Sequence, residues 1–174
     1  MTTRVKLVTR IALLSALIYV LSWATSYLPN VNLAFFIAFM AGFLWGIWAG
    51  VPVGAIGMWL WTSFNPFGPA LLPVAMAQIA GLALCGLLGG LFRPILIRSV
   101  SRGRPVPELL LAALLCTLVF YVPVLLTDAW VLQPFWPRLL TGIPFAAISL
   151  VANLIIFPLL FGATRRISER EGVL

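Results

Sequence analysis

An all-α, polytopic membrane protein is the fold class that this sequence predicts: a bundle of six transmembrane helices with the N- and C-termini cytoplasmic. Of its 174 residues, 63% are hydrophobic and 9% are charged, whereas about 25% charged residues is usual in soluble domains. No Asp, Glu, Lys or Arg occurs from Ile11 to Phe92. That stretch must hold several spans, because about 20 apolar residues cross a membrane. We therefore expect residues 1–174 to form one transmembrane domain, with no room for a soluble catalytic domain.

The first three helices follow from turn residues and from length. The first helix should end before Pro29, because proline disfavours helical backbone in the residue that precedes it. Residues 31–61 carry no charge and would form a helix of about 46 Å, too long for a hydrocarbon core of about 30 Å. Gly46, Gly50 and Pro52 mark the break, since glycine favours helix ends and proline favours first turns. The helices are expected at residues 9–28, 31–48 and 51–64.

The last three helices are separated by polar or turn-forming segments. Residues 65–69, Asn-Pro-Phe-Gly-Pro, form a turn cluster. An arginine-rich connection occupies residues 93–107, and a polar loop occupies residues 128–137. The helices are expected at residues 70–92, 108–127 and 138–163.

The basic residues report the topology of the chain. The net charge is +7, but the basic residues lie at helix ends and form no stripe along one face. With the N-terminus inside, ten of the eleven are cytoplasmic and only Arg138 is outside, which is the bias of cytoplasmic loops. We therefore expect contact with membrane lipid and none with nucleic acid.

Small residues recur at four-residue spacing on three of the expected helices. Such residues let helix backbones approach closely in lipid, where apolar area alone drives little association. Packing inside the bundle is the favoured explanation for the second and fourth helices, whereas the first helix could equally face another protein chain. The stripes are Ala12 and Ala16; Gly42 and Gly46; and Ala77, Gly81, Cys85 and Gly89.

Several kinds of chemistry lack the residues they need. There is no histidine, and Lys6 is the single lysine, which excludes a histidine triad, a His-liganded metal and a Walker A lysine. The acidic residues Glu108, Asp128, Glu169 and Glu171 lie near helix ends, so no mid-membrane proton relay is predicted. We expect no enzyme activity, no cofactor and no metal.

Polar and aromatic residues gather in or beside the expected outer loops, Trp61, Gln133 and Arg138 among them. An interfacial aromatic belt is one explanation, and a ligand pocket with flat apolar walls and directed hydrogen bonds is the other. Gln78 and Asn153 are deeper, where an amide either bridges helices or reaches into the pocket. The candidate substrate-binding residues are Asn30, Asn32, Trp59, Asn65, Gln78, Tyr121, Asp128, Trp130, Trp136 and Asn153.

In this combination the chain resembles the substrate-binding S component of energy-coupling factor (ECF) vitamin transporters, over almost its whole length. The resemblance rests on a basic N-terminus leading into residues 12–16, the Pro-Asn-Val-Asn turn at 29–32, the glycine-rich segment 41–46, and the loop 65–69 followed by a helix into Arg93.

The resemblance implies a subunit in the plasma membrane of a prokaryote that captures a vitamin or vitamin precursor from outside. A separate membrane coupling subunit and two cytoplasmic ATPases would supply the energy. The family's AxxxA motif, which docks on the coupling subunit, maps onto Ala12 and Ala16. The Pro-Asn turn and the outer tryptophans favour a cobalamin-like or flavin-like ligand. The alternatives are a non-transporting membrane assembly protein, which predicts no ligand, and a self-sufficient small carrier.

Overall fold

The computed structural model describes residues 3–103 and 105–173, and these residues form six α-helices and no β-strand. Five of the helices, all except α2, are long and apolar enough to cross a membrane, which confirms an all-helical chain and is compatible with a multi-pass membrane protein. The helices are α1 (Thr3–Ala24), α2 (Ala34–Trp45), α3 (Ile47–Phe64), α4 (Leu72–Ser101), α5 (Val106–Val131) and α6 (Phe135–Arg170).

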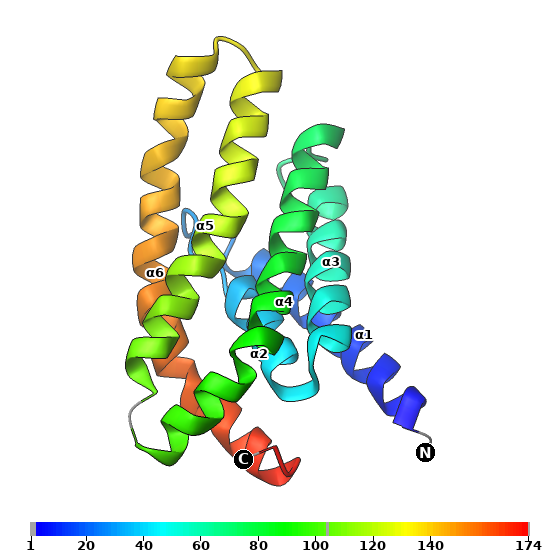
Figure 1. The fold of residues 1–174 in the computed structure, drawn as a ribbon. Helices are drawn as coiled ribbons and strands as arrows, with labels where there is room; N and C mark the ends of the chain where they lie inside the picture. The colour runs from blue at the N-terminus through cyan, green and yellow to red at the C-terminus, as the bar shows by residue number, and fades with distance from the viewer. Residues whose placement is uncertain (1–2, 104, 174) are drawn as a thin grey trace.

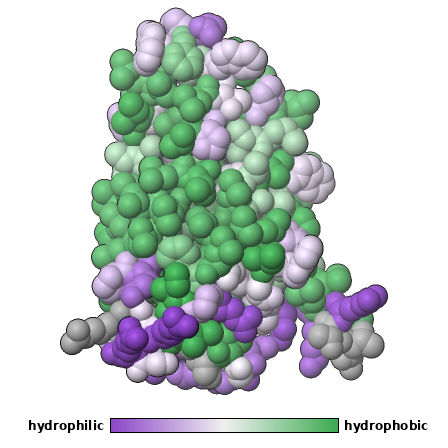
Figure 2. Space-filling model, viewed as in Figure 1, coloured by the Kyte–Doolittle hydropathy of each residue, from purple (hydrophilic) through white to green (hydrophobic). Residues whose placement is uncertain are grey.

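Both ends of the chain lie at the same end of the bundle (Figure 1). Helices α5 and α6 form a long antiparallel hairpin that extends beyond α3 and α4 at the opposite end, and the first turns of α1 extend away from the bundle. In Figure 2, hydrophobic residues cover the middle of the visible face, and hydrophilic residues gather at the end that carries the termini. This face thus has an apolar middle and a strongly polar end beside the termini.

Helix α2 is much shorter than the span expected at residues 31–48. Its 12 residues extend about 18 Å, which is less than the hydrocarbon core of about 30 Å. The helix starts late because the Asn32 side chain accepts a hydrogen bond from the Ala34 backbone N–H at 2.9 Å. It ends at Gly46, where φ is +83°. The break at Gly46 is confirmed, Pro52 lies inside α3, and a sixth complete crossing stays a prediction.

The other helix boundaries differ from the expected ones mostly by extension. Helix α1 covers residues 3–24 where 9–28 was expected, and α4 continues to Ser101, past Arg93 and Pro94. Only residues 132–134 separate α5 from α6. Hydropathy marks where a helix enters lipid, but intrahelical hydrogen bonds can continue in water, so the expected boundaries fell short.

Helices α2, α3 and α4 are in direct backbone contact through glycines. A Cβ atom added at Gly86 would lie 2.0 Å from the carbonyl oxygen of Gly50. One added at Gly42 would lie 2.0 Å from the Gly86 oxygen, and one at Gly89 would lie 1.9 Å from the Phe39 oxygen. The structure therefore confirms that Gly42 and Gly89 serve for packing inside the bundle.

Candidate functional site

A partly open cavity of about 640 Å³ is bounded by the α1–α2 loop and by parts of all six helices. Phe67, from the α3–α4 connection, lines it together with Asp128 and Arg138, which flank the α5–α6 connection. Both connections lie at the end of the bundle opposite the termini (Figure 1). The cavity therefore occupies the half of the molecule that faces away from the basic clusters.

An aromatic cluster forms one wall of this cavity. The rings of Phe35 on α2 and Phe120 on α5 meet edge to face, with centroids 4.9 Å apart. Tyr121 lies parallel to Phe35 at a centroid distance of 6.2 Å, and all three residues line the cavity. Edge-to-face and offset arrangements are the favoured ones for aromatic rings, so this wall is well packed and largely apolar.

The α1–α2 loop is fastened to α5 and α6 through Asn30. The Tyr121 hydroxyl donates to the Asn30 Oδ1 at 3.0 Å, and the Ser149 hydroxyl donates to the Asn30 carbonyl oxygen at 2.6 Å. Tyr121 and Ser149 are themselves 2.8 Å apart. Asn30 has φ +56°, a left-handed conformation that asparagine tolerates better than most residues. These contacts hold the loop in place as a cavity wall.

A second polar pair anchors the other end of the same loop. Asn32 and Ser22 exchange hydrogen bonds, with Asn32 Nδ2 donating to Ser22 Oγ at 3.1 Å and Ser22 Oγ lying 3.2 Å from Asn32 Oδ1. Ser22 is buried on α1. Because a buried hydroxyl must find a partner, this pair ties the end of α1 to the start of α2.

The charged residues of the cavity neutralise each other. Arg138 Nε donates to Asp128 Oδ2 at 2.7 Å, and the side chains are 48% and 23% exposed. Since a partly exposed pair of this kind contributes little to stability, its main effect here is that the cavity carries no net charge.

The structure brings together five of the ten candidate binding residues around the cavity. These are Asn30, Asn32, Gln78, Tyr121 and Asp128. Trp61 and Arg138, which the sequence places in the same outer group, line it as well.

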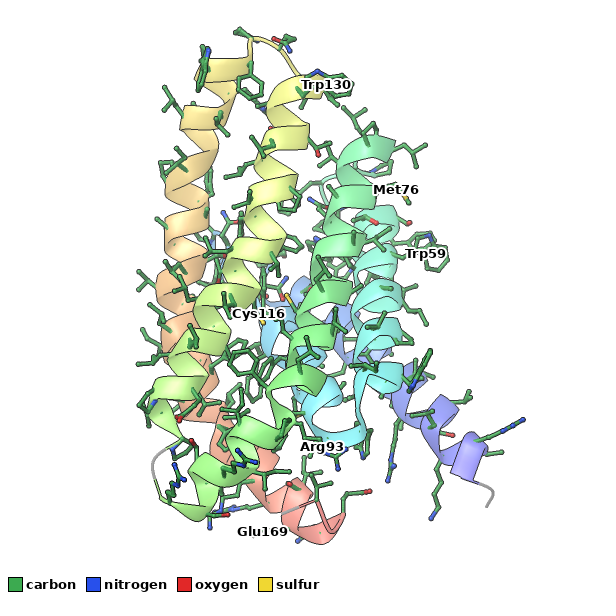
Figure 3. All side chains as sticks on the ribbon, in the orientation of Figure 1. Trp59, Met76, Arg93, Cys116, Trp130 and Glu169 are labelled. Carbon is green, nitrogen blue, oxygen red and sulfur yellow. The ribbon has the colours of Figure 1, made fainter. Side chains whose placement is uncertain are left out.

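The remaining five candidates lie outside the cavity lining. Trp59 points away from the bundle (Figure 3) and is 52% exposed. Trp130 and Trp136 are more exposed still, as an aromatic belt would require. The Asn65 side chain caps its own turn, bonding the Trp61 carbonyl and the Phe67 N–H. Asn153 is buried and donates to Thr117 Oγ1 at 3.0 Å, so it bridges α5 and α6.

Sequence reasoning missed several lining residues, among them Ser22, Phe35, Phe120, Thr141 and Phe145. The phenylalanines carry no signal, because an apolar side chain suits lipid and a cavity equally well. Thr141 could have been found, since it lies one helical turn after Arg138 and therefore on the same face of α6.

The small-residue face of α1 is uncovered. Ala12 and Ala16 are both exposed, and their neighbours Leu13 and Leu17 are 65% and 40% exposed. No other helix of the described chain covers this face, so it is available to lipid or to a partner.

Among the described residues, no group of three or more His, Cys, Asp or Glu side chains could hold a metal ion.

Comparison with known proteins gives no relative: no family model, no curated protein and no solved structure matches this chain.

Proposed function

We propose that this chain is the membrane-embedded substrate-capture subunit of an ECF-type ABC importer. It binds a water-soluble vitamin or vitamin precursor from outside and delivers it inward with a separate coupling subunit and two cytoplasmic ATPases. The observation that supports this most directly is the cavity of about 640 Å³. Cavities of about 300–1,000 Å³ with apolar walls and a few polar groups are typical of small-molecule sites.

The distribution of charge supports the direction of capture. Hydrophilic residues gather at the end of the bundle that carries the termini (Figure 2), and Arg93 and Glu169 lie there (Figure 3). Because cytoplasmic segments carry an excess of Lys and Arg, we assign this end to the cytoplasm. The cavity then faces the outside of a prokaryotic plasma membrane.

The proposal assigns the energy source and the docking of partners to different parts of the complex. The sequence has no Walker A motif, so ATP hydrolysis falls to the ATPase subunits. The exposed face of Ala12 and Ala16 suits close approach of a helix from the coupling subunit, because small side chains let backbones meet in lipid.

Ligand capture is tested by mass spectrometry of small molecules released when the detergent-purified protein is denatured. We expect one stoichiometric compound from the unaltered chain and its loss from Thr141→Trp, which fills the cavity from α6. The matched control is Leu140→Trp, because Leu140 is 62% exposed and lies outside the cavity lining. Absence of any compound, even after incubation with a panel of vitamins, would contradict capture and favour the assembly protein.

Docking is tested by uptake in cells that contain the coupling module. Ala12→Trp or Ala16→Trp should abolish uptake while ligand binding in detergent is retained. Leu159→Trp, on the exposed face of α6, is the control and should leave both uptake and binding intact. Equal loss of uptake and binding would indicate damage to the fold. Uptake by the unaltered chain without the coupling module would indicate a self-sufficient carrier.

A further inference from the structure

The charges around the cavity leave no free counter-ion for a charged ligand. Asp128 and Arg138 line the cavity and pair with each other at 2.7 Å. A cationic or anionic ligand would have to compete with that pair or lie in the cavity without a counter-ion, and burying an ion without a partner is costly. The cavity therefore selects against ligands that carry a net charge.

Most of the polar side chains that line the cavity are already engaged within the protein. Ser22 pairs with Asn32, and Asn30 pairs with Tyr121. Thr141 donates to the carbonyl oxygen of Arg138 at 2.8 Å. These bonds engage the hydroxyl groups and the side-chain oxygens of the two asparagines, whereas the Asn30 Nδ2 group keeps its donors free within the described chain.

Gln78 differs from those residues. It projects from α4 and lines the cavity, and its carboxamide makes no hydrogen bond with any residue that the structure describes. The indole N–H of Trp61, on α3, is likewise free of hydrogen bonds within the described chain. A carboxamide offers one acceptor and one donor group side by side, and Gln78 is only partly buried, so both groups are open to a ligand. Gln78 therefore points to a ligand with the complementary edge, a carbonyl next to an N–H.

The rest of the cavity indicates the shape of that ligand. Phe35, Phe120 and Tyr121 provide aromatic surface for stacking. The volume of about 640 Å³ suits a compound of drug-like size, such as two or three fused rings.

We propose that the ligand is an uncharged, planar heteroaromatic compound with a lactam, imide or carboxamide edge, and that Gln78 recognises this edge by paired hydrogen bonds. This inference rests on the proposed function and names its substrate class. Gln78 acts as the specificity-determining residue, and the aromatic wall supplies most of the contact area.

The test measures binding of four probes to the detergent-purified protein. Lumichrome, whose ring system ends in an imide, and nicotinamide are the uncharged probes; thiamine is the cation and biotin the anion. We expect at least one uncharged probe to bind and neither charged probe to compete with it. Gln78→Leu, which keeps the size but removes the hydrogen bonds, should weaken binding by about tenfold to a hundredfold. Gln133→Leu is the control, because Gln133 caps its own turn outside the cavity.

A double comparison separates recognition by Gln78 from general damage. 1,3-Dimethyl-lumichrome has no N–H beside its carbonyl groups, so it should bind the unaltered protein more weakly than lumichrome does. In Gln78→Leu the two compounds should bind equally. Equal binding of both compounds to the unaltered protein would overturn the role of Gln78.

The proposed function and this inference fail in different ways. Tight binding of thiamine or biotin, or release of a charged compound from the purified protein, would overturn the inference and leave the capture function standing. If no probe binds and no compound is released on denaturation, both are overturned.

Discussion

Replacing Gly86 by alanine tests whether backbone contact between α3 and α4 holds the bundle together. The added Cβ would lie 2.0 Å from the Gly50 carbonyl oxygen and 2.2 Å from its carbon. Real Cβ atoms essentially never approach a neighbour within 3.0 Å, so the helices must separate by about 1 Å (3.0 − 2.0). The atoms that block the added Cβ belong to the backbone of Gly50, so a change of side-chain rotamer cannot relieve the overlap.

Two opposing effects set the size of the loss. Alanine favours a helix over glycine by about 1 kcal/mol. Overpacking costs typically 1–3 kcal/mol, and we place this site at about 3 kcal/mol because a backbone atom blocks the added methyl group. The net loss in the free energy of unfolding is then about 2 kcal/mol. For a chain of this length that lowers the Tm by roughly 4–8 °C.

Thermal unfolding in detergent, followed by tryptophan fluorescence, measures this change. Gly162→Ala is the matched control, because Gly162 lies inside α6 and a Cβ there meets nothing within 4 Å. It should leave the Tm unchanged or raise it slightly, since only the helix propensity changes. If Gly86→Ala were as stable as Gly162→Ala, the close contact between α3 and α4 would be wrong.

Three further predictions concern topology, the α1–α2 loop and the buried amide. On a background without the two native cysteines, Phe67→Cys should react with a membrane-impermeant maleimide in intact cells, and Ser101→Cys only after permeabilisation; the reverse pattern would invert the assigned topology. Tyr121→Phe removes the hydroxyl that bonds the loop and α6 and should speed hydrogen exchange in residues 25–33 about tenfold. Tyr27→Phe, at a position 93% exposed, should not, and equal rates in both variants would show that the hydroxyl does not hold the loop. Asn153→Leu should lower the free energy of unfolding by about 0.6–1 kcal/mol, because its partner hydroxyl keeps a second bond within α5; a loss above 3 kcal/mol would show that the amide has a larger role.

The sequence predicts the ends of helices well where a glycine or a proline-containing turn sets them. Gly46 ends α2 with a positive φ that glycine adopts without strain, and the Asn-Pro-Phe-Gly-Pro segment at 65–69 separates α3 from α4. Both signals are local, so no knowledge of the neighbouring helices is needed. The position of the α1–α2 loop is different, because the bonds from Tyr121 and Ser149 to Asn30 join residues about 90 and 120 positions apart.

The candidate site was harder to predict, for a reason that Trp59 and Trp61 illustrate. Two positions apart on a helix, they differ by about 200° in direction, and one faces away from the bundle while the other lines the cavity. In a soluble helix the polar face would reveal which is which. A membrane helix has apolar residues on both faces, so its sequence does not encode the direction of the cavity.

The glycine contacts described above also limit how this molecule can change shape. Residues one helical turn apart share a helix face, so sliding α4 by one turn in one direction would bring the side chain of Leu82 to the point where Gly86 now meets the Gly50 oxygen. Sliding it by one turn in the other direction would bring the side chain of Arg93 to the point where Gly89 now meets the Phe39 oxygen. Steric overlap therefore fixes the register of α2, α3 and α4, and these helices can move only as one block. Any rearrangement that accompanies ligand binding must then arise in α1, in the α1–α2 loop or in the α5–α6 hairpin. Spin-label distances between α4 and α6 should report such a rearrangement, and distances between α3 and α4 should stay constant.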